Sequence, residues 1–342
     1  MKRKIFSVLI ACFVVFLASC TDKSLTETTS ENTSYSESTT EEATTDERTT
    51  IPPAQELGAE DTTAESIPGN TSLSGRIFYG ENTGTDKTLT GLEPLEKREF
   101  RLTADDKFSE MPTTLREHSY GVAAEEKPHN ISVANQQFFD EKGFDAVCLD
   151  TKSEEKVLYL TFDCGYENGY TSRILDVLKE KGVTAAFFCT LPQVRDNKEL
   201  ISRMINEGHI VGNHSVNHPD FSSLSAEKII AEVGDFDNYM RENFGYSSLY
   251  FRYPQGKYSE RSTAVLNDLG FKCVFWSLAY ADWDLDNQKG ALHAYETVLA
   301  RLHPGAVILL HSVSPDNAEA LSDIIDAAVS RGYIFRSLEE LD

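Results

Sequence analysis

Residues 157–165 read VLYLTFDCG, an apolar run that ends in an acid, a cysteine and a glycine. The six residues Val157–Phe162 are apolar, aromatic or β-branched, which is typical of a strand buried on both faces. Asp163 follows directly, at the carboxyl end of that expected strand. In α/β folds, active sites gather at the carboxyl ends of parallel strands. Asp163 is therefore the first candidate site residue.

Similar short apolar runs continue to the end of the chain and alternate with amphipathic stretches of helical length. We expect strands at Val157–Phe162, Thr184–Cys189, His209–Gly212, Leu249–Phe251, Cys273–Ser277, Ala306–Leu310 and Ile334–Arg336. We expect helices at Ser172–Lys181, Glu199–Glu207, Ala226–Phe244, Glu260–Leu269, Ala291–Leu302 and Asn317–Arg331. This alternation predicts a parallel sheet. Because most connecting helices are single and evenly spaced, a barrel is favoured over a doubly wound sheet.

Residues capable of chemistry follow successive predicted strands. They are Asp163 and Cys164 after the first strand, His214 and His218 after the third, Arg252 after the fourth, Asp282 after the fifth and His311 after the sixth. Each one alone has an ordinary explanation, such as a helix cap for an aspartate or a satisfied core histidine. The spacing of the two histidines would place both on one side of a helical turn, where they suit a metal, although such pairs also occur by chance. Their joint position predicts an active site.

These residues lie in motifs that resemble those of the NodB-type polysaccharide deacetylases, carbohydrate esterase family 4, over residues 155–342. The five motifs, in order, are Thr161-Phe162-Asp163-Cys164-Gly165, His214-Ser215-Val216-Asn217-His218, Arg252-Tyr253-Pro254-Gln255-Gly256, Asp282-Trp283 and Leu309-Leu310-His311. Within the family, the chain is most similar to the spore-type peptidoglycan N-acetylmuramic acid deacetylases. That similarity lies in Gly165-Tyr166-Glu167-Asn168-Gly169-Tyr170, Gly212-Asn213-His214-Ser215, His303-Pro304-Gly305-Ala306 and Ser312-Val313-Ser314-Pro315-Asp316-Asn317-Ala318-Glu319-Ala320.

The resemblance implies a distorted (β/α) barrel and hydrolysis of an N-acetyl group to an amine and acetate. It implies one divalent metal ion, with Zn²⁺ as the expected metal, on His214 and His218. Asp163 would be the general base and His311 the general acid. Arg252 would orient Asp163, and the backbone N–H near Gln255 would contact the oxyanion. Trp283 and Leu309 would form an apolar slot for the acetyl methyl.

Two positions depart from the commoner family pattern. Cys164 stands where most members have a second, metal-binding aspartate and where the muramic acid subgroup has asparagine. Either its thiolate is a third metal ligand, or its thiol is an uncharged substitute that contributes little. The sequence favours neither alternative. Ala279 stands where many relatives have an aspartate thought to orient the catalytic histidine. Asp282 is the nearest candidate to replace that aspartate, or it holds its own loop together.

The N-terminus has the features of a bacterial lipoprotein signal. Three basic residues precede the apolar run Ile5–Leu17, which is too short to span a bilayer comfortably. The run ends in Leu17-Ala18-Ser19-Cys20, which resembles a lipobox in which Cys20 would become the lipid-modified N-terminus. An ordinary signal peptide with an incidental cysteine is the alternative. A lipid at Cys20 would hold the protein at the outer face of the cytoplasmic membrane, facing the cell wall.

The next segment, residues 21–72, is a predicted spacer. Ser and Thr fill 16 of the 30 positions from 21 to 50, and residues 21–72 carry 12 acidic residues against Lys23 and Arg48. Such a polar, acidic segment cannot bury enough apolar surface to offset its ordering entropy. We therefore expect a flexible tether, with an interaction tail as the alternative. The formal net charge of −23 argues against a nucleic-acid partner.

The rest of the chain divides at residue 113. Residues 73–112 have charges of both signs and no clear period, so their structure is left unassigned. Residues 113–342 form the predicted deacetylase domain. Within it, residues 113–155 resemble an N-terminal addition of the muramic acid subgroup that packs beside the barrel, and no catalytic role is expected of them.

The expected substrate is therefore peptidoglycan glycan, at N-acetylmuramic acid, for muramic δ-lactam formation in spore cortex or for modification of vegetative wall. No protein partner is predicted. One alternative is a deacetylase that acts on N-acetylglucosamine or on acetylated xylan instead. Another is an inactive, lipid-anchored glycan-binding module, suggested by Cys164 and Ala279. Retention of a matched base, acid and histidine pair argues against the inactive module.

Overall fold

The computed structural model describes residues 75–84, 87–103, 107–119 and 121–341. The predicted signal segment 1–20, with the lipidation site Cys20, and the predicted spacer 21–72 lie outside these residues. Within the described ranges, every helix is too short or too polar to cross a membrane.

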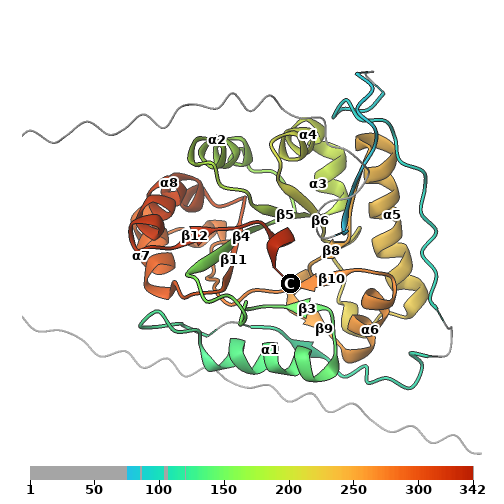
Figure 1. Ribbon diagram of the computed structural model, residues 1–342, viewed down its shortest axis with the longest axis horizontal. Helices are drawn as coiled ribbons and strands as arrows, with labels where there is room; N and C mark the ends of the chain where they lie inside the picture. The colour runs from blue at the N-terminus through green and yellow to red at the C-terminus, as the bar shows by residue number, and fades with distance from the viewer. Residues whose placement is uncertain (1–74, 85–86, 104–106, 120, 342) are drawn as a thin grey trace, which may run out of the picture. The chain divides into compact units, whose positions relative to one another are not determined.

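One eight-stranded sheet forms the centre of the fold, and all its pairs of strands are parallel (Figure 1). Its strand order is β11 (Ala306–His311), β4 (Val157–Cys164), β5 (Ala186–Cys189), β6 (Ile210–Asn213), β8 (Tyr250–Phe251), β10 (Lys272–Val274) and β3 (Ala146–Val147), with β12 (Ile334–Phe335) pairing with β4. All eight residues of β4 are buried. The apolar run around residue 160 is therefore a central strand, as the sequence predicts.

The sheet curls until the chain beyond β10 meets β11. The Ser277 N–H donates to the Val307 carbonyl at 2.9 Å, and the Leu309 N–H donates to the Leu278 carbonyl at 2.9 Å. Leu278 and Ile308 form an isolated parallel bridge. Because the closure consists of such short contacts rather than a full strand pair, the barrel is irregular. This confirms the predicted distorted (β/α) barrel.

Six helices that pack around the sheet correspond to the six predicted ones within two residues at either end (Figure 1). They are α2 (Thr171–Lys181), α4 (Lys198–Asn206), α5 (Ala226–Phe244), α6 (Glu260–Asp268), α7 (Ala291–Arg301) and α8 (Pro315–Ser330). A further short helix, α3 (Leu191–Asp196), is not among the predicted ones; it begins after the N-cap Thr190 and has a proline in its first turn. Short 3₁₀ segments occupy Phe221–Ser223, Pro254–Gly256, Leu285–Asn287 and Leu338–Glu340.

The unassigned and extension segments are part of the folded unit. In the first, β1 (Ile77–Tyr79) pairs antiparallel with β7 (Tyr246–Ser248), and Phe100 packs in the core. In the second, β2 (Arg116–Glu117) pairs with β9 (Lys257–Tyr258), α1 (Asn130–Lys142) packs on β3, and β3 itself pairs with β10. The expectation that residues 113–155 pack beside the barrel is wrong for β3, because that strand continues the sheet.

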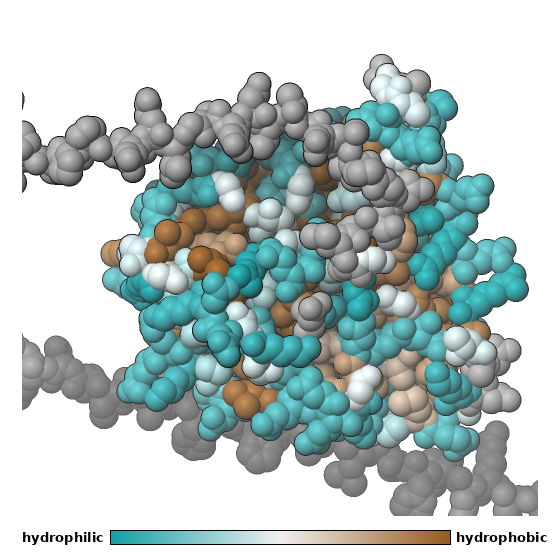
Figure 2. Space-filling model, in the orientation of Figure 1, coloured by the Kyte–Doolittle hydropathy of each residue, from teal (hydrophilic) through white to brown (hydrophobic). Residues whose placement is uncertain are grey.

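On the face seen in Figure 2, hydrophilic residues predominate and hydrophobic residues form small separate groups. Such scattered apolar groups are ordinary on the surface of a folded domain.

Candidate active site

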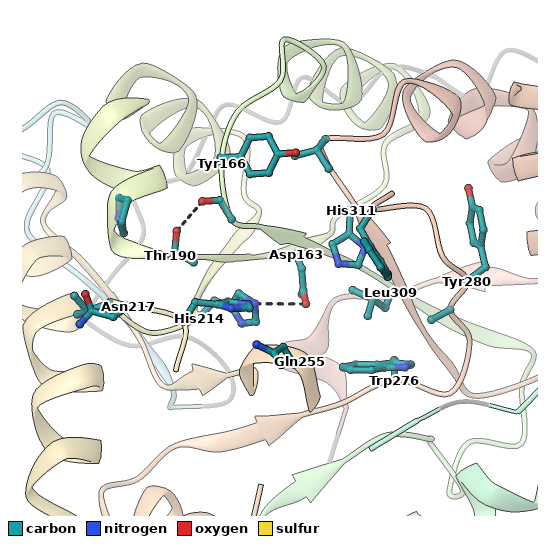
Figure 3. A pocket seen from close by; sticks show the side chains of 17 residues that line it. Asp163, Tyr166, Thr190, His214, Asn217, Gln255, Trp276, Tyr280, Leu309 and His311 are labelled. Carbon is teal, nitrogen blue, oxygen red and sulfur yellow. Dashed lines mark hydrogen bonds and ion pairs between the residues drawn. The ribbon is translucent and has the colours of Figure 1, made fainter. Parts of the chain in front are cut away.

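A cavity of about 950 Å³ opens at the carboxyl ends of the strands, as predicted for this fold (Figure 3). Seven of the predicted site residues line it: Asp163, His214, His218, Gln255, Trp283, Leu309 and His311. Arg252 and Asp282 lie behind this lining, where each contacts one of the lining residues. Cys164 is not among the residues that line the cavity.

Asp163 is held from behind by Arg252. The Arg252 Nη1 atom donates to Asp163 Oδ1 at 3.0 Å and to Thr161 Oγ1 at 2.8 Å. Its Nε and Nη2 atoms donate to the carbonyls of Val274 and Phe275. Since the guanidinium is fully buried and its donors converge on fixed acceptors, Asp163 has one well-defined orientation.

The same contact keeps Asp163 ionised. Burial raises the pKa of this carboxyl, but the charge of Arg252 and the nearby imidazoles outweigh burial, so the pKa lies below its usual value. Asp163 Oδ2 remains directed toward His214, with 3.7 Å between Oδ2 and His214 Nε2. A buried carboxylate with one oxygen anchored and one facing the cavity is suited to accept a proton.

His214 has its imidazole fixed in one tautomer. Its Nδ1 atom lies 2.8 Å from the Arg252 backbone carbonyl, which can only accept a hydrogen bond, so Nδ1 carries the proton. Nε2 then presents a lone pair to the cavity. Burial lowers the pKa of His214 to about 4, which keeps the ring neutral near pH 7.

His218 reaches His214 through a loop and not through a helical turn. The ring centroids of His214 and His218 are 4.9 Å apart. Ser215 and His218 have φ values of 72° and 54°, in the left-handed region, so the prediction that a helical turn joins the two histidines is wrong. The loop is fixed because the Glu232 carboxylate accepts the backbone N–H groups of Val216 and Asn217, each at 2.9 Å.

The two imidazoles fit a divalent metal that prefers nitrogen ligands. A tautomer fixed by a hydrogen bond from Nδ1 to a carbonyl is the usual preparation of a metal-binding histidine. Over the described part of the chain, however, no cluster of three or more His, Cys, Asp or Glu side chains is arranged to hold a metal. His214 and His218 are therefore the two protein ligands available to a metal. Water and substrate would occupy the other coordination positions.

Cys164 faces the core instead of the cavity. It follows Asp163 on β4, where successive side chains point to opposite sides, and it is fully buried among apolar residues. Its partner in register on β5 is another buried cysteine, Cys189, whose thiol donates to the Phe187 carbonyl. This placement gives no support to Cys164 as a third ligand and agrees with the alternative of an uncharged substitute.

His311 is paired with Asp282, which is one of the two roles that the sequence leaves open for this aspartate. His311 Nδ1 lies 2.7 Å from Asp282 Oδ1, and the His311 backbone N–H donates to Oδ2 at 2.7 Å. Burial lowers the pKa of His311, but the Asp282 charge and hydrogen bond outweigh burial, so this pKa lies above its usual value. The pair can therefore hold a proton that the Nε2 side of the ring offers to the cavity. Ala279 has no polar side chain that could make a comparable contact, and its backbone carbonyl accepts a hydrogen bond from Arg301.

Apolar side chains form one wall of the cavity. Leu309 and Trp276 are almost fully buried there, and they lie next to Gln255 in the view of Figure 3. Trp283 lines the same cavity but is 59% exposed, so it belongs to the rim rather than to an enclosed slot. Gln255 has a φ of 57°, in the left-handed region, at the turn that follows β8. The enclosed part of this wall is therefore formed by Leu309 and Trp276, and the predicted pairing of Trp283 with Leu309 in an enclosed slot is not seen.

Sequence reasoning missed Trp276, Tyr166 and the support from His118. Trp276 lies within an expected strand, and Tyr166 lies within the quoted Gly165–Tyr170 segment, but neither had a signal that pointed to the cavity. His118 Nε2 lies 2.7 Å from the Trp276 carbonyl, and the His118 N–H donates to Gly256 at 2.8 Å. A Cβ at Gly256 would lie 2.8 Å from the His118 carbonyl, so this close approach requires glycine.

The arrangement is suited to hydrolysis of an amide. A carboxylate held by Arg252 and an imidazole held by Asp282 face one cavity, with Asp163 lying between His214 and His311 in the view of Figure 3. Their pKa values are displaced in opposite senses, which is the pattern of a base and an acid that act in the same reaction.

Comparison with known proteins agrees with this chemistry. Residues 150–274 match the family model described as polysaccharide deacetylase. The peptidoglycan-N-acetylmuramic acid deacetylase PdaA of Bacillus subtilis is 46% identical over 199 residues, which cover 58% of this chain and 75% of that protein. A chitooligosaccharide deacetylase of Sinorhizobium fredii is 33% identical over 197 residues, which cover 54% of this chain and 90% of that protein. The structure of Bacillus subtilis PdaA, a family 4 carbohydrate esterase, superposes with a TM-score of 0.64 and 40% identity, covering 67% of this chain and 97% of that one.

Proposed function

Because the chain belongs to the polysaccharide deacetylase family and is a hydrolase of carbon–nitrogen bonds other than peptide bonds, we propose that it removes acetyl groups from N-acetylmuramic acid in peptidoglycan. The observation that carries the chemistry is the pairing of Arg252–Asp163 and Asp282–His311 around one cavity. The similarity to PdaA supports the choice of sugar.

The proposed mechanism assigns one task to each of these groups. Asp163 takes a proton from the attacking water through Oδ2, the oxygen that Arg252 leaves unoccupied. His311 gives a proton to the departing amine nitrogen while Asp282 stabilises the imidazolium. Leu309 and Trp276 surround the acetyl methyl, which excludes long acyl chains. The family's third motif implies an oxyanion contact from the backbone N–H near Gln255.

A divalent metal, Zn²⁺ by preference, would be held by His214 and His218. When bound, it would supply Lewis-acid polarisation of the acetyl carbonyl and lower the pKa of the attacking water. Deacetylases of this family depend on a metal in general. The neutral His214 ring, with its Nε2 lone pair directed into the cavity, supports this assignment.

Acetate release from defined glycans tests the proposal. The purified protein is incubated with peptidoglycan strands, with and without stem peptides, and with chitooligosaccharides and acetylated xylan. We expect acetate and free amine on muramic acid, loss of release after chelation, and recovery on addition of Zn²⁺. The His214→Ala protein should show no recovery, because it lacks one of the two imidazole ligands.

Each outcome of that experiment has a definite meaning. Free amine on glucosamine alone would identify N-acetylglucosamine as the substrate. The likeness to a chitooligosaccharide deacetylase makes this sugar the second candidate. Release that resists chelation and persists in His214→Ala would contradict the metal assignment. Binding of strands with no release from any of these polymers would establish the inactive glycan-binding module instead.

Tyr166 provides a further prediction about glycan binding. Its ring is 52% exposed, yet its loop is anchored because the Glu167 carboxylate accepts the Gly169 N–H and Asn168 donates to the Val313 carbonyl. An exposed ring that lines the cavity on an anchored loop can stack on the apolar face of a sugar. Tyr166→Ala should raise KM for glycan strands about tenfold and leave kcat unchanged, since such aromatic contacts contribute about 1.4 kcal/mol.

Steady-state kinetics on strands of defined length measure this effect. Tyr166→Phe is the matched control, because it keeps the ring and loses only the hydroxyl. Unchanged KM in Tyr166→Ala, or an equal rise in both variants, would show that the ring does not contact the glycan.

We also propose that Cys20 carries a lipid that holds the protein at the outer face of the cytoplasmic membrane, with residues 21–72 as the tether. Metabolic labelling with a fatty-acid probe, lost in Cys20→Ala, tests the anchor. The associated biological role is muramic δ-lactam formation. Analysis of cortex from a deletion strain tests that role, since unchanged muramic lactam would contradict it.

A further inference from the structure

The segment that follows β11, residues 312–320, has no task in the mechanism above. We propose that Asn317 from this segment and Tyr280 from the loop after β10 are positioning residues for the deacetylation. Together they fix the Asp282 carboxylate that holds His311. This inference rests on the proposed function, because it concerns the same acid.

Asn317 is fully buried at the start of α8, between Asp282 and His311. Its Nδ2 atom donates to Asp282 Oδ2 at 2.5 Å and also lies 3.4 Å from the His311 carbonyl. Its own N–H donates to Ser314 Oγ, the N-cap of the helix, at 3.2 Å. The side chain that contacts Asp282 is therefore attached to a rigid point of the fold.

Tyr280 determines which way the Asn317 amide faces. An amide can turn over and exchange its oxygen and nitrogen, so its orientation depends on its partners. A carboxylate such as Asp282 accepts hydrogen bonds only, and it therefore requires Nδ2. The Tyr280 hydroxyl lies 2.5 Å from Asn317 Oδ1 and donates to it. Without that hydroxyl, the amide oxygen would have no donor in this network, and the orientation would be less strongly selected.

The consequence for catalysis lies in the number of hydrogen bonds that the Asp282 carboxylate accepts. Its Oδ1 accepts from His311 Nδ1, and its Oδ2 accepts from the His311 backbone N–H and from Asn317. The two contacts with His311 alone would let the carboxylate and the ring move together. The third contact, from a different element, ties the pair to α8. The ring then keeps its Nε2 side toward the cavity where the amine departs.

The loop around Asp282 has other attachments to α8, so loss of Asn317 should not unfold it. Ser314 Oγ bonds to Gln288 Oε1 at 2.8 Å, and Gln288 Nε2 donates to the Asp282 carbonyl at 2.8 Å. The Asp316 carboxylate accepts the N–H groups of Lys289 and Gly290. A variant at Asn317 therefore tests the position of the carboxylate more than the integrity of the loop.

The first test is the kinetics of Asn317→Leu and Tyr280→Phe on the glycan that the wild-type protein deacetylates. Asn317→Leu should lower kcat by about 10- to 100-fold, the range found when partners of functional side chains are removed. Tyr280→Phe should lower kcat about fivefold, as expected for one neutral hydrogen bond. KM should change by less than about twofold in both, because neither change alters the donors that face the sugar.

Matched variants separate positioning from general damage. Asn243→Leu and Tyr295→Phe remove the same groups from α5 and α7, away from Asp282, and should retain full kcat. In a His311→Ala background, Asn317→Leu should cause no further loss, since residues that act through one group are not additive. Unchanged kcat in Asn317→Leu, or an equal further loss in the His311→Ala background, would overturn the proposal.

A second measurement does not depend on activity. In ¹H–¹⁵N NMR spectra of the imidazole groups, the His311 Nδ1–H signal should be sharp and downfield in the wild-type protein and broadened or lost in Asn317→Leu. An identical signal in both proteins would contradict the positioning role. Failure of the wild-type protein to release acetate from any glycan would instead count against the proposed function, so the two failures are distinguishable.

Discussion

Asp163→Asn is expected to lower kcat for acetate release by about 100- to 10,000-fold, the usual contribution of a general base. The amide retains an oxygen that can accept the Arg252 hydrogen bond at the position of Oδ1. It cannot take a proton from water at Oδ2, where the carboxylate faces His214. Single-turnover measurement of acetate release on glycan strands would follow this loss without interference from product release.

Folding and substrate binding should be nearly unchanged in this variant. Asp196→Asn, on the exposed side of α3, is the matched control and should keep full activity. Binding of glycan strands by Asp163→Asn should stay within about twofold of wild type, since the side chain has almost the same shape. A variant that keeps one-tenth or more of the wild-type kcat would exclude Asp163 as the base.

Arg252→Met is expected to lower the free energy of unfolding by about 3–5 kcal/mol, as when one partner of a buried ion pair is removed. The Asp163 carboxylate would stay buried without its counter-charge. The carbonyls of Val274 and Phe275 would each lose a donor as well. Urea denaturation followed by circular dichroism measures this change.

The double variant Arg252→Met, Asp163→Asn separates the charge from the lost packing. It should recover part of the stability, because the amide is neutral and no uncompensated charge remains. Arg101→Met, which removes one member of the exposed pair with Glu99, should leave the unfolding free energy nearly unchanged. Equal losses in the single and double variants would mean that the ion pair does not account for the effect.

The sequence by itself determined the class of fold and most of the site. Runs such as Val157–Phe162 are typical of strands buried on both faces, and their alternation with helices predicts a barrel or a doubly wound sheet. Chemically capable residues at the ends of those strands must then meet at one edge. This is why Asp163, His214 and His311 were predicted together although 148 positions separate the first from the last.

The local sequence pattern did not predict those segments whose conformation depends on long-range packing. The short strand β3 is recognisable only through its pairing with β10, and α3 depends on a cap and a proline within six residues. His214 and His218 meet because Glu232 on α5 fixes a loop with left-handed residues. Neither their spacing nor a helical turn accounts for the contact.

Only the tertiary structure decided what supports each catalytic group. Whether Cys164 faces the cavity or the core depends on the pleat of β4 and on Cys189 beside it, not on the residue type. The pairing of Asp282 with His311, and of Asn317 with Asp282, joins residues from a loop, a strand and a helix. Hydrogen bonds require atoms to lie within about 3 Å, and sequence periodicity fixes the sheet edge at which a side chain lies but not its position to that precision.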